Sequence, residues 1–141
     1  MEHQIKEFRK EDIDKEELKK QIPAWCNLLR ESPDDVRLRI IVASMFYFID
    51  EKQKSLKLLK NAPNGENIEL KEVKAIVYMD LDYYNEALEL FNEILDADYN
   101  KSILDLKVDC LFLLEYLLVI YFFVFLLYMV LYSKSRIYHS R

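Results

Sequence analysis

Glycine is almost absent from this sequence, which has only Gly65 among its 141 residues. Phosphate-binding loops, the dinucleotide fingerprint and most tight β-hairpin turns need glycine, because their backbone is left-handed or lies very close to a ligand. Cysteine is also scarce, and the two thiols, Cys26 and Cys110, are far apart, so free thiols are expected rather than a disulfide framework. Helices remain as the expected elements, and the predicted fold class is all-α.

Histidine occurs only as His3 and His139, at opposite ends of the sequence, and neither has a partner at metal-ligand spacing. Neither a histidine-based metal site nor a catalytic triad is therefore expected. Carboxylates are numerous, but a pair such as Asp34 and Asp35 is typical of a helix start and of solvated surface. The sequence predicts no enzyme activity, no cofactor and no metal.

Clusters of basic residues are missing as well. The chain has 20 lysines and arginines against 25 aspartates and glutamates, which gives a net charge of −5. Three of the basic residues and one of the acidic residues follow residue 109, so residues 1–109 carry a net charge of −7. Because binding to phosphates depends on clustered lysine and arginine, no nucleic-acid partner is expected.

A long apolar run dominates the C-terminal part of the sequence. Glu115 is the only charged residue from Cys110 to Tyr132, and the run from Tyr116 to Ser133 is uncharged throughout. At about 1.5 Å per residue, a helix of that length measures ~27 Å and crosses the hydrocarbon core of a bilayer. A transmembrane helix is predicted over residues 110–133, followed by a short basic tail over 134–141. The predicted membrane-anchor residues are Tyr116, Phe122, Phe123, Phe125, Tyr128 and Tyr132.

This run offers no polar face, which disfavours a helix that lies in the membrane surface. A single-pass topology is expected, with a cytosolic N-terminal domain and insertion after synthesis. The apolar run favours the endoplasmic reticulum or Golgi, the basic tail favours the mitochondrial outer membrane, and the positive-inside trend conflicts with this orientation. Two alternatives are a buried core helix of a larger assembly and an aberrant tail that replaces the rest of a longer repeat protein.

An N-terminal helical segment is predicted over residues 1–31. Its apolar residues recur at steps of four, three and four, the spacing of one helix face: Leu18, Ile22, Trp25 and Leu29. Pro23 interrupts this pattern and predicts either a kinked helix or two short ones. Ser32 is the expected N-cap of the next helix, with Pro33 at its first position.

Two antiparallel helix pairs are predicted over residues 32–109. The interval from Ala43 to Ala75 equals the interval from Ser55 to Ala87, and we call it the repeat interval. It is close to the roughly 34-residue period of tetratricopeptide repeats. Two packed helices need small residues where they cross and large residues beside the crossing. The predicted repeat-packing residues are Ala43, Phe46, Ser55, Leu59, Ala75, Tyr78, Tyr84, Ala87 and Phe91.

The segment from Ile68 to Lys101 resembles a tetratricopeptide repeat. Its small and aromatic residues stand at the positions that the family uses for helix crossing: Ala75, Tyr78, Tyr84, Ala87 and Phe91. It departs from the family at Asp82, where a turn glycine is usual, and at Tyr99, where a closing proline is usual. The resemblance implies an α-solenoid fragment, and the alternative is core packing in an unrelated helical bundle.

Within this superfamily, residues 36–108 look like the central repeats of the coatomer epsilon subunit family. The likeness rests on Ala43-Ser44-Met45-Phe46-Tyr47, Ser55-Leu56-Lys57-Leu58-Leu59 and Ala87-Leu88-Glu89-Leu90. It implies a cytosolic helical-repeat subunit that binds the alpha subunit of a vesicle coat. Helix pairs followed by one anchor and a basic end also resemble, in architecture, the fission adaptor of the mitochondrial outer membrane.

The sequence as a whole predicts a membrane-tethered helical-repeat adaptor or scaffold, with vesicle coats or membrane traffic as its setting. Its expected partners are a membrane and a protein, bound as a helix or an extended peptide, with a coat subunit as one candidate. Two alternatives are a soluble coat subunit of the epsilon type with an aberrant tail and a tail-anchored adaptor of the organelle-fission type.

Overall fold

The computed structural model describes residues 14–98 and 100–139, and this part of the chain is all-α, as predicted. Five shorter helices are followed by one long helix, with no strand among the described residues. The helices are α2 (Lys15–Glu31), α3 (Val36–Phe48), α4 (Lys52–Lys60), α5 (Ile68–Asp80), α6 (Tyr84–Ala97) and α7 (Lys101–His139).

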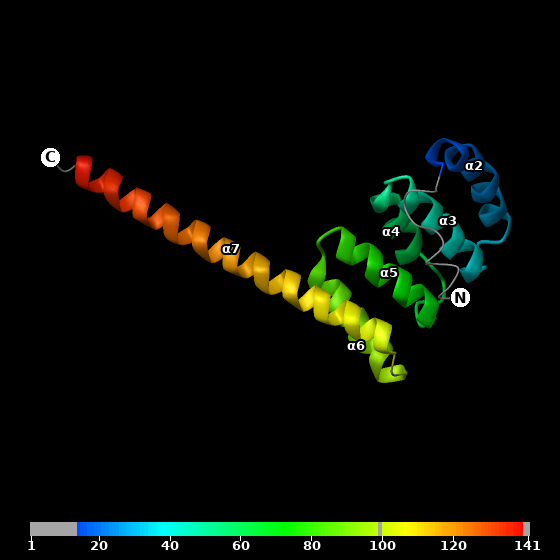
Figure 1. Ribbon diagram of the computed structural model, residues 1–141. Helices are drawn as coiled ribbons and strands as arrows, with labels where there is room; N and C mark the ends of the chain where they lie inside the picture. Colours follow the sequence, from blue (N-terminus) through cyan, green and yellow to red (C-terminus); the bar gives the residue numbers. More distant parts are fainter. Residues whose placement is uncertain (1–13, 99, 140–141) are drawn as a thin grey trace.

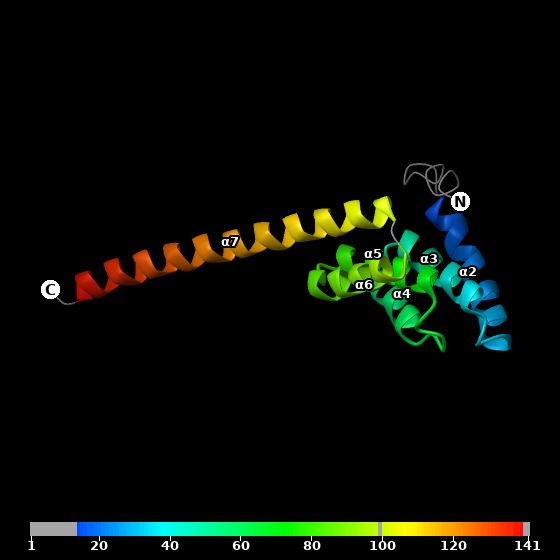
Figure 2. The same cartoon turned by 90° about the horizontal axis from the view of Figure 1, so that it is seen from below.

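The shorter helices pack in chain order into one body, and α7 leaves it as a projecting rod (Figure 1). The closest packing joins α3 with α4, α5 with α6, and α6 with α7, and α2 lies on α3 at the other end. Figure 2 shows the same rod from below, with α7 running along α6 before it extends beyond the body. We call α2 to α6, together with the part of α7 that packs on α6, the helical body.

Helix α2 runs through Pro23 without a break, so of the two predicted alternatives the structure has one helix and not two. Asp14 caps its N-terminus by accepting from the backbone N–H groups of Glu16 and Glu17 at 3.1 and 3.2 Å. Its apolar face buries Ile22 and Leu29. Burial of this face holds the helix together across the position where proline donates no hydrogen bond.

The predicted start of the second helix at Ser32 is wrong. The N–H of Ser32 donates to the carbonyl of Leu28 at 3.1 Å, so this residue ends α2. Asp35 is the N-cap of α3, because its side chain accepts from the N–H of Leu38 at 3.0 Å. The positive end of the helix dipole also stabilises the negative charge of this carboxylate.

The helices of the two pairs begin at the same positions when one pair is shifted by the repeat interval, and only the ends of α4 and α6 differ. Helix α3 begins at Val36 and α5 at Ile68, while α4 begins at Lys52 and α6 at Tyr84. The N-caps correspond as well, because Asn67 accepts from the N–H of Leu70 at 2.9 Å just as Asp35 accepts from Leu38. The spacing seen in the small residues of the sequence therefore also holds for the starts of the helices.

The turns inside the two pairs share an unusual backbone conformation. Asp50 and Asp82 have φ angles of 64° and 65°, in the left-handed region that non-glycine residues seldom occupy. The next N–H reaches back to close each helix: Glu51 donates to the carbonyl of Phe46 and Tyr83 to that of Tyr78, both at 2.9 Å. Asp82 thus adopts the conformation for which a glycine would be usual, and the turn forms without one.

Two buried clusters form the core of the body, and α5 contributes to both. One lies between α3, α4 and α5 around Leu59 and Val77, and the other between α5, α6 and α7 around Phe91. Ala43, Ala75 and Ala87 have no exposed surface. Small side chains let the helices approach, and the large ones fill the space beside each crossing.

Helix α7 belongs to the body over its first part. Asn100 caps it by accepting from the N–H of Ser102 at 2.9 Å, and it follows the equivalent cap Asn67 by one position more than the repeat interval. Ile103 and Cys110 are buried against α6, and the Cys110 thiol lies 3.5 Å from the Tyr84 carbonyl. The predicted transmembrane segment begins at Cys110, but no helix break occurs there, and this residue lies in the core of the body.

Candidate functional site

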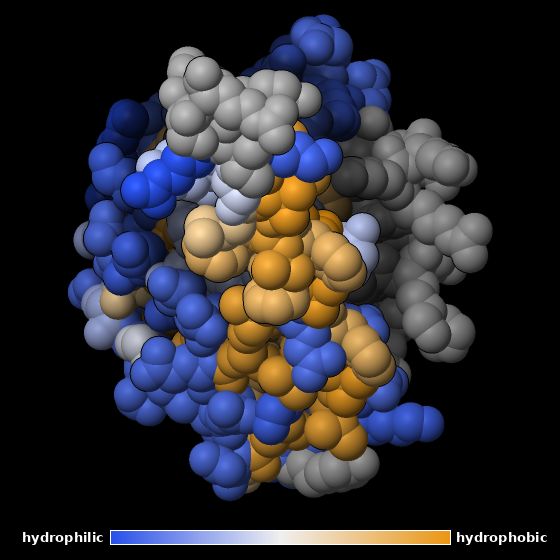
Figure 3. Space-filling view, turned by 90° about the vertical axis from the view of Figure 1, so that its left-hand side faces the viewer, coloured by the Kyte–Doolittle hydropathy of each residue, from blue (hydrophilic) through white to orange (hydrophobic). Residues whose placement is uncertain are grey.

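Beyond Leu117, α7 presents apolar side chains on every side. No side chain from 118 to 136 is buried, and only 6% of the most apolar 18-residue window is covered by the rest of the described chain. The helix from Lys101 to Arg136 is long and apolar enough to cross a membrane by length and composition. Figure 3 looks toward the end of this rod and shows its apolar surface against the largely hydrophilic body.

The six predicted membrane-anchor residues all lie on this rod and are all well exposed. Their exposed fractions run from 53% at Tyr132 to 65% at Phe123. Tyr128 and Tyr132 stack on one another, one helical turn apart, with ring centroids 6.3 Å apart. Their contact with lipid stays a prediction.

Seven of the nine predicted repeat-packing residues are buried, namely Ala43, Ser55, Leu59, Ala75, Tyr84, Ala87 and Phe91. Ser55 is a polar residue at a crossing where Ala87 stands in the second pair, and its hydroxyl finds no hydrogen-bond partner among the residues that the structure describes. Phe46 and Tyr78 are only half-buried. Each of these two aromatic residues lines a groove on the surface of the body.

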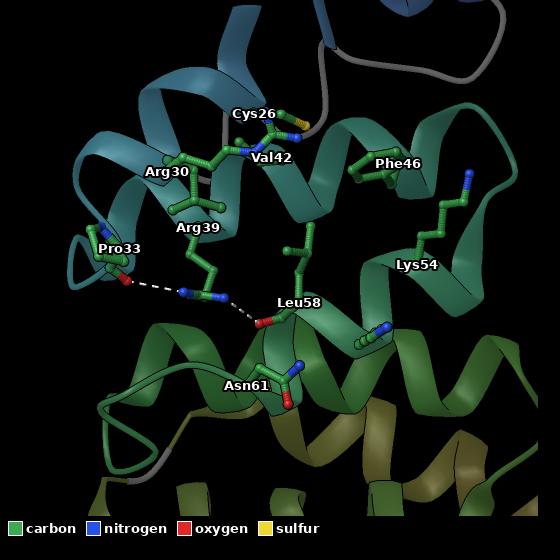
Figure 4. Close-up of a pocket in the computed structure, with 11 residues that line it drawn as sticks. Cys26, Arg30, Pro33, Arg39, Val42, Phe46, Lys54, Leu58 and Asn61 are labelled. Atoms are coloured by element: carbon green, nitrogen blue, oxygen red, sulfur yellow. Dashed lines mark hydrogen bonds between the residues drawn. The ribbon is translucent and has the colours of Figure 1, made fainter. Parts of the chain in front are cut away.

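The first groove, which we call the basic groove, lies between α2 and α4 over α3 and has a volume of about 450 Å³. Its charged lining residues are all cations, Arg30, Arg39, Lys54 and Lys57. Figure 4 shows these side chains around an apolar floor to which Val42, Phe46 and Leu58 contribute. The charge of this lining is opposite in sign to the net charge of the whole chain, which is −5.

Arg39 lies across the base of the basic groove and forms hydrogen bonds on both sides of it. Its guanidinium donates to the carbonyl of Pro33 at 3.0 Å and to that of Leu58 at 3.3 Å (Figure 4). The Nε atom is buried and has no hydrogen-bond partner within residues 14–98 and 100–139. No carboxylate of the described residues forms an ion pair with this guanidinium.

A second groove, which we call the acidic groove, lies on α5 and α6 and has a volume of about 330 Å³. Lys71 at its centre forms ion pairs with Glu93 at 3.0 Å and with Glu66 at 3.1 Å. Hydrogen bonds to these two carboxylates raise the pKa of Lys71. Glu86, Glu89 and Lys74 also line this groove, so its carboxylates outnumber its cations and Lys71 is neutralised within the chain.

The two grooves occupy corresponding places in the two helix pairs. A shift by the repeat interval takes Arg39 to Lys71, Phe46 to Tyr78, and Leu58 to Leu90, and each of these residues lines its groove. The same shift takes Lys54, Lys57 and Asn61 to Glu86, Glu89 and Glu93. Sequence reasoning missed both grooves, although the replacement of lysines by glutamates between the aligned helices α4 and α6 was visible in the sequence.

Tyr84 joins α6 to the turn before it and makes the body sensitive to alkaline pH. Its hydroxyl donates to the Asp82 carboxylate at 2.8 Å, and this bond, together with burial, raises the pKa of Tyr84. A tyrosine in the unfolded chain loses its proton near pH ~10. The folded state holds the proton more tightly, so its stabilising effect is complete below that pH and is lost as the pH rises further.

We therefore expect the free energy of unfolding to fall as the pH rises above ~10. The change Tyr84→Phe should reduce this fall, while Tyr83→Phe, on an exposed neighbour, should leave it unchanged. Urea titrations at neutral and alkaline pH measure the difference. Tyr47 and Tyr78 also have raised pKa values, each mainly through burial, so part of the fall should persist in the variant. If the free energy of unfolding fell equally with pH in Tyr84→Phe and in the parent chain, the attribution of this pH dependence to Tyr84 would be contradicted.

The described residues contain no group of three or more histidine, cysteine, aspartate or glutamate side chains placed to hold a metal ion. Comparison of the chain with protein-family models, with curated proteins and with solved structures found no match.

Proposed function

We propose that this chain is a membrane-tethered adaptor, in which α7 spans the bilayer and the helical body binds a protein partner. The observation that carries the proposal is the uncovered apolar surface of α7 beyond Leu117. Water solvates such a surface poorly, at a cost of roughly 25 cal/mol for each Å² of apolar area. A lipid environment removes that cost, and a helix satisfies its own backbone hydrogen bonds there.

The charged residues near the ends of the apolar rod agree with this placement. Glu115 is exposed where α7 separates from the body, and Lys134 and Arg136 are exposed beyond the far end. These residues then lie at the two membrane surfaces, with the uncharged run from Tyr116 to Ser133 between them. Because α7 is continuous, the body sits directly on one membrane surface.

The helix pairs support the adaptor role. Their helix starts, side-chain N-caps and left-handed turns recur at the repeat interval, which favours two tandem tetratricopeptide-like units. Asn100 caps α7 close to the position where the first helix of a third unit would begin. Stacked units of this kind present long surfaces to protein segments. A vesicle coat or another membrane-traffic assembly, with a coat subunit as partner, is the proposed setting, on a membrane of the endoplasmic reticulum, the Golgi or the mitochondrial surface.

Carbonate extraction of a tagged full-length chain tests the membrane span. The parent chain should stay in the membrane pellet in alkaline carbonate and in high salt, because its attachment is not electrostatic. Phe123→Arg together with Phe125→Arg should release it, since each arginine near the centre of a span costs about 2.5 to 3.5 kcal/mol.

Leu28→Arg with Ile41→Arg is the matched control, because these apolar residues are exposed on the body. This variant should remain in the pellet. Release of the parent chain by carbonate, or a detergent-free monodisperse parent chain in buffer, would contradict the proposal. Either result would favour the soluble coat-subunit alternative.

A further inference from the structure

The basic groove and the acidic groove differ in how their central cation is neutralised. Lys71 of the acidic groove has two carboxylates within ion-pair distance, Glu93 at 3.0 Å and Glu66 at 3.1 Å. Arg39, its counterpart one repeat interval earlier, has in the described part of the chain two carbonyl acceptors, no carboxylate, and a buried Nε without a partner. A partly buried charge without a counter-ion is costly, so the basic groove is electrostatically incomplete.

The residues around Arg39 explain why its positive charge has no counter-ion among the described residues. Asn61 stands where Glu93 supplies the counter-ion in the acidic groove, and Lys57 stands where Glu89 stands. Arg30 and Lys57 are exposed, and neither forms an ion pair among the described residues. Of the groove's four cations, Lys54 alone forms an ion pair among the described residues, with the Glu51 carboxylate at 3.1 Å. No described carboxylate neutralises Arg39, so an occupant that carries negative charge would complete the groove.

The floor of the basic groove adds a second requirement. Leu29 and Val42 are buried beneath it, and Phe46 and Leu58 are half-buried along it. This apolar strip lies between the cations in Figure 4. An occupant with both carboxylates and a large apolar side chain satisfies the rim and the floor together, whereas a free anion satisfies only the rim.

The place of the groove favours a protein segment over a lipid headgroup. The groove lies at α2 and α4, whereas α7 packs on α6 at the other end of the body. Figure 1 shows α2 on the side of the body away from the projecting rod. Headgroups of the membrane that α7 enters are therefore remote from Arg39.

We infer that the basic groove binds an acidic segment of a partner protein, with carboxylates against Arg39, Arg30 and Lys57 and an apolar side chain on the floor. This inference rests on the proposed adaptor function and deepens it by naming the site and the class of partner. Charge complementarity of this kind gives both specificity and rapid association.

Fluorescence anisotropy tests the inference with the full chain in nanodiscs of phosphatidylcholine, a neutral lipid. The probe is a labelled acidic decapeptide of glutamates with two leucines, and a glutamine decapeptide with the same leucines is its control. Asn61→Glu gives the basic groove the counter-ion of the acidic groove, so the acidic peptide should bind about tenfold more weakly. Asn61→Gln has nearly the same size without the charge and should bind as the parent chain does.

A second matched pair separates the groove from the general charge of the surface. Lys57→Glu should weaken binding by about fivefold to tenfold, while Lys60→Glu, the same change on an exposed α4 residue outside the groove, should have little effect. Unchanged binding in Asn61→Glu and Lys57→Glu would overturn the inference. So would equal losses in Lys57→Glu and Lys60→Glu, or equal affinity for the acidic and glutamine peptides.

Two further outcomes identify a different occupant and would also overturn the inference. One is loss of peptide binding in nanodiscs that contain phosphatidylserine, which would place lipid headgroups in the groove. The other is self-association of the parent chain that Lys57→Glu abolishes, which would make a second copy the occupant. Carbonate extraction measures membrane attachment and does not depend on peptide binding. A failure of the proposed binding site is therefore distinguishable from a failure of the proposed membrane span.

Discussion

Ending the chain after Leu117 is expected to leave a folded, water-soluble helical body, whereas ending it after Asn100 is expected to unfold that body. The shorter chain loses the part of α7 that buries Ile103 and Cys110 against α6. It also exposes Phe91, whose side chain is fully buried in the complete protein. Together these changes remove on the order of 5 kcal/mol of apolar burial, comparable to the whole stability of a small domain.

Circular dichroism and gel filtration without detergent measure the difference between the two truncated chains. The chain that ends after Leu117 should be helical and monodisperse with a cooperative thermal transition. The chain that ends after Asn100 should aggregate or show no transition. If both behave alike, the first part of α7 is not a structural part of the body.

The change Phe91→Ala is expected to lower the free energy of unfolding by about 3 to 5 kcal/mol. Phe91 has no exposed surface and lies in the cluster that joins α5, α6 and α7. Truncation there leaves a cavity at the contact that attaches the rod to the body. Urea unfolding of the chain that ends after Leu117, followed by circular dichroism, measures the change.

Glu89→Ala on the same helix is the control, because Glu89 is exposed and its change should stay within about 0.5 kcal/mol. Equal urea midpoints for Phe91→Ala and Glu89→Ala would show that the cluster around Phe91 is not the core of the body.

Helix α7 has two roles that meet at Leu117. Before it, the helix packs on α6 and completes the core, and from 118 to 136 the same helix presents only exposed side chains. No flexible linker separates the two parts, because the helix is continuous from Lys101 to His139. In the proposed function, the body therefore has a fixed orientation relative to the membrane rather than hanging from a tether.

Several features of this fold follow from local rules and were readable from the sequence. The scarcity of glycine and the helical spacing of apolar residues predicted the all-α fold, which is confirmed. The turns at Asp50 and Asp82 were placed correctly, because acidic residues interrupt two apolar patterns there. The apolar run after residue 110 predicted the long helix, since no other element satisfies its backbone within a hydrocarbon environment.

Local rules failed where two neighbouring residues offered the same chemistry. Ser32 and Asp35 are both good N-caps, and the sequence favoured Ser32 because Pro33 follows it. The structure uses Ser32 to end α2 and Asp35 to begin α3. Continuity of α2 through Pro23 depended likewise on the burial of Ile22 and Leu29, which only a packed neighbour provides.

The sequence alone thus determined the helices, the repeat interval and an apolar segment that water solvates poorly, because these depend on the order of side chains along the chain. Only the tertiary structure decided that Cys110 packs against α6 in the core of the body and that a groove lined by four cations lies around Arg39. Both depend on which helices come together, and charges from α2, α3 and α4 meet only when the chain has folded. Burial and electrostatics act through space, so the spacing of residues along the chain does not reveal them.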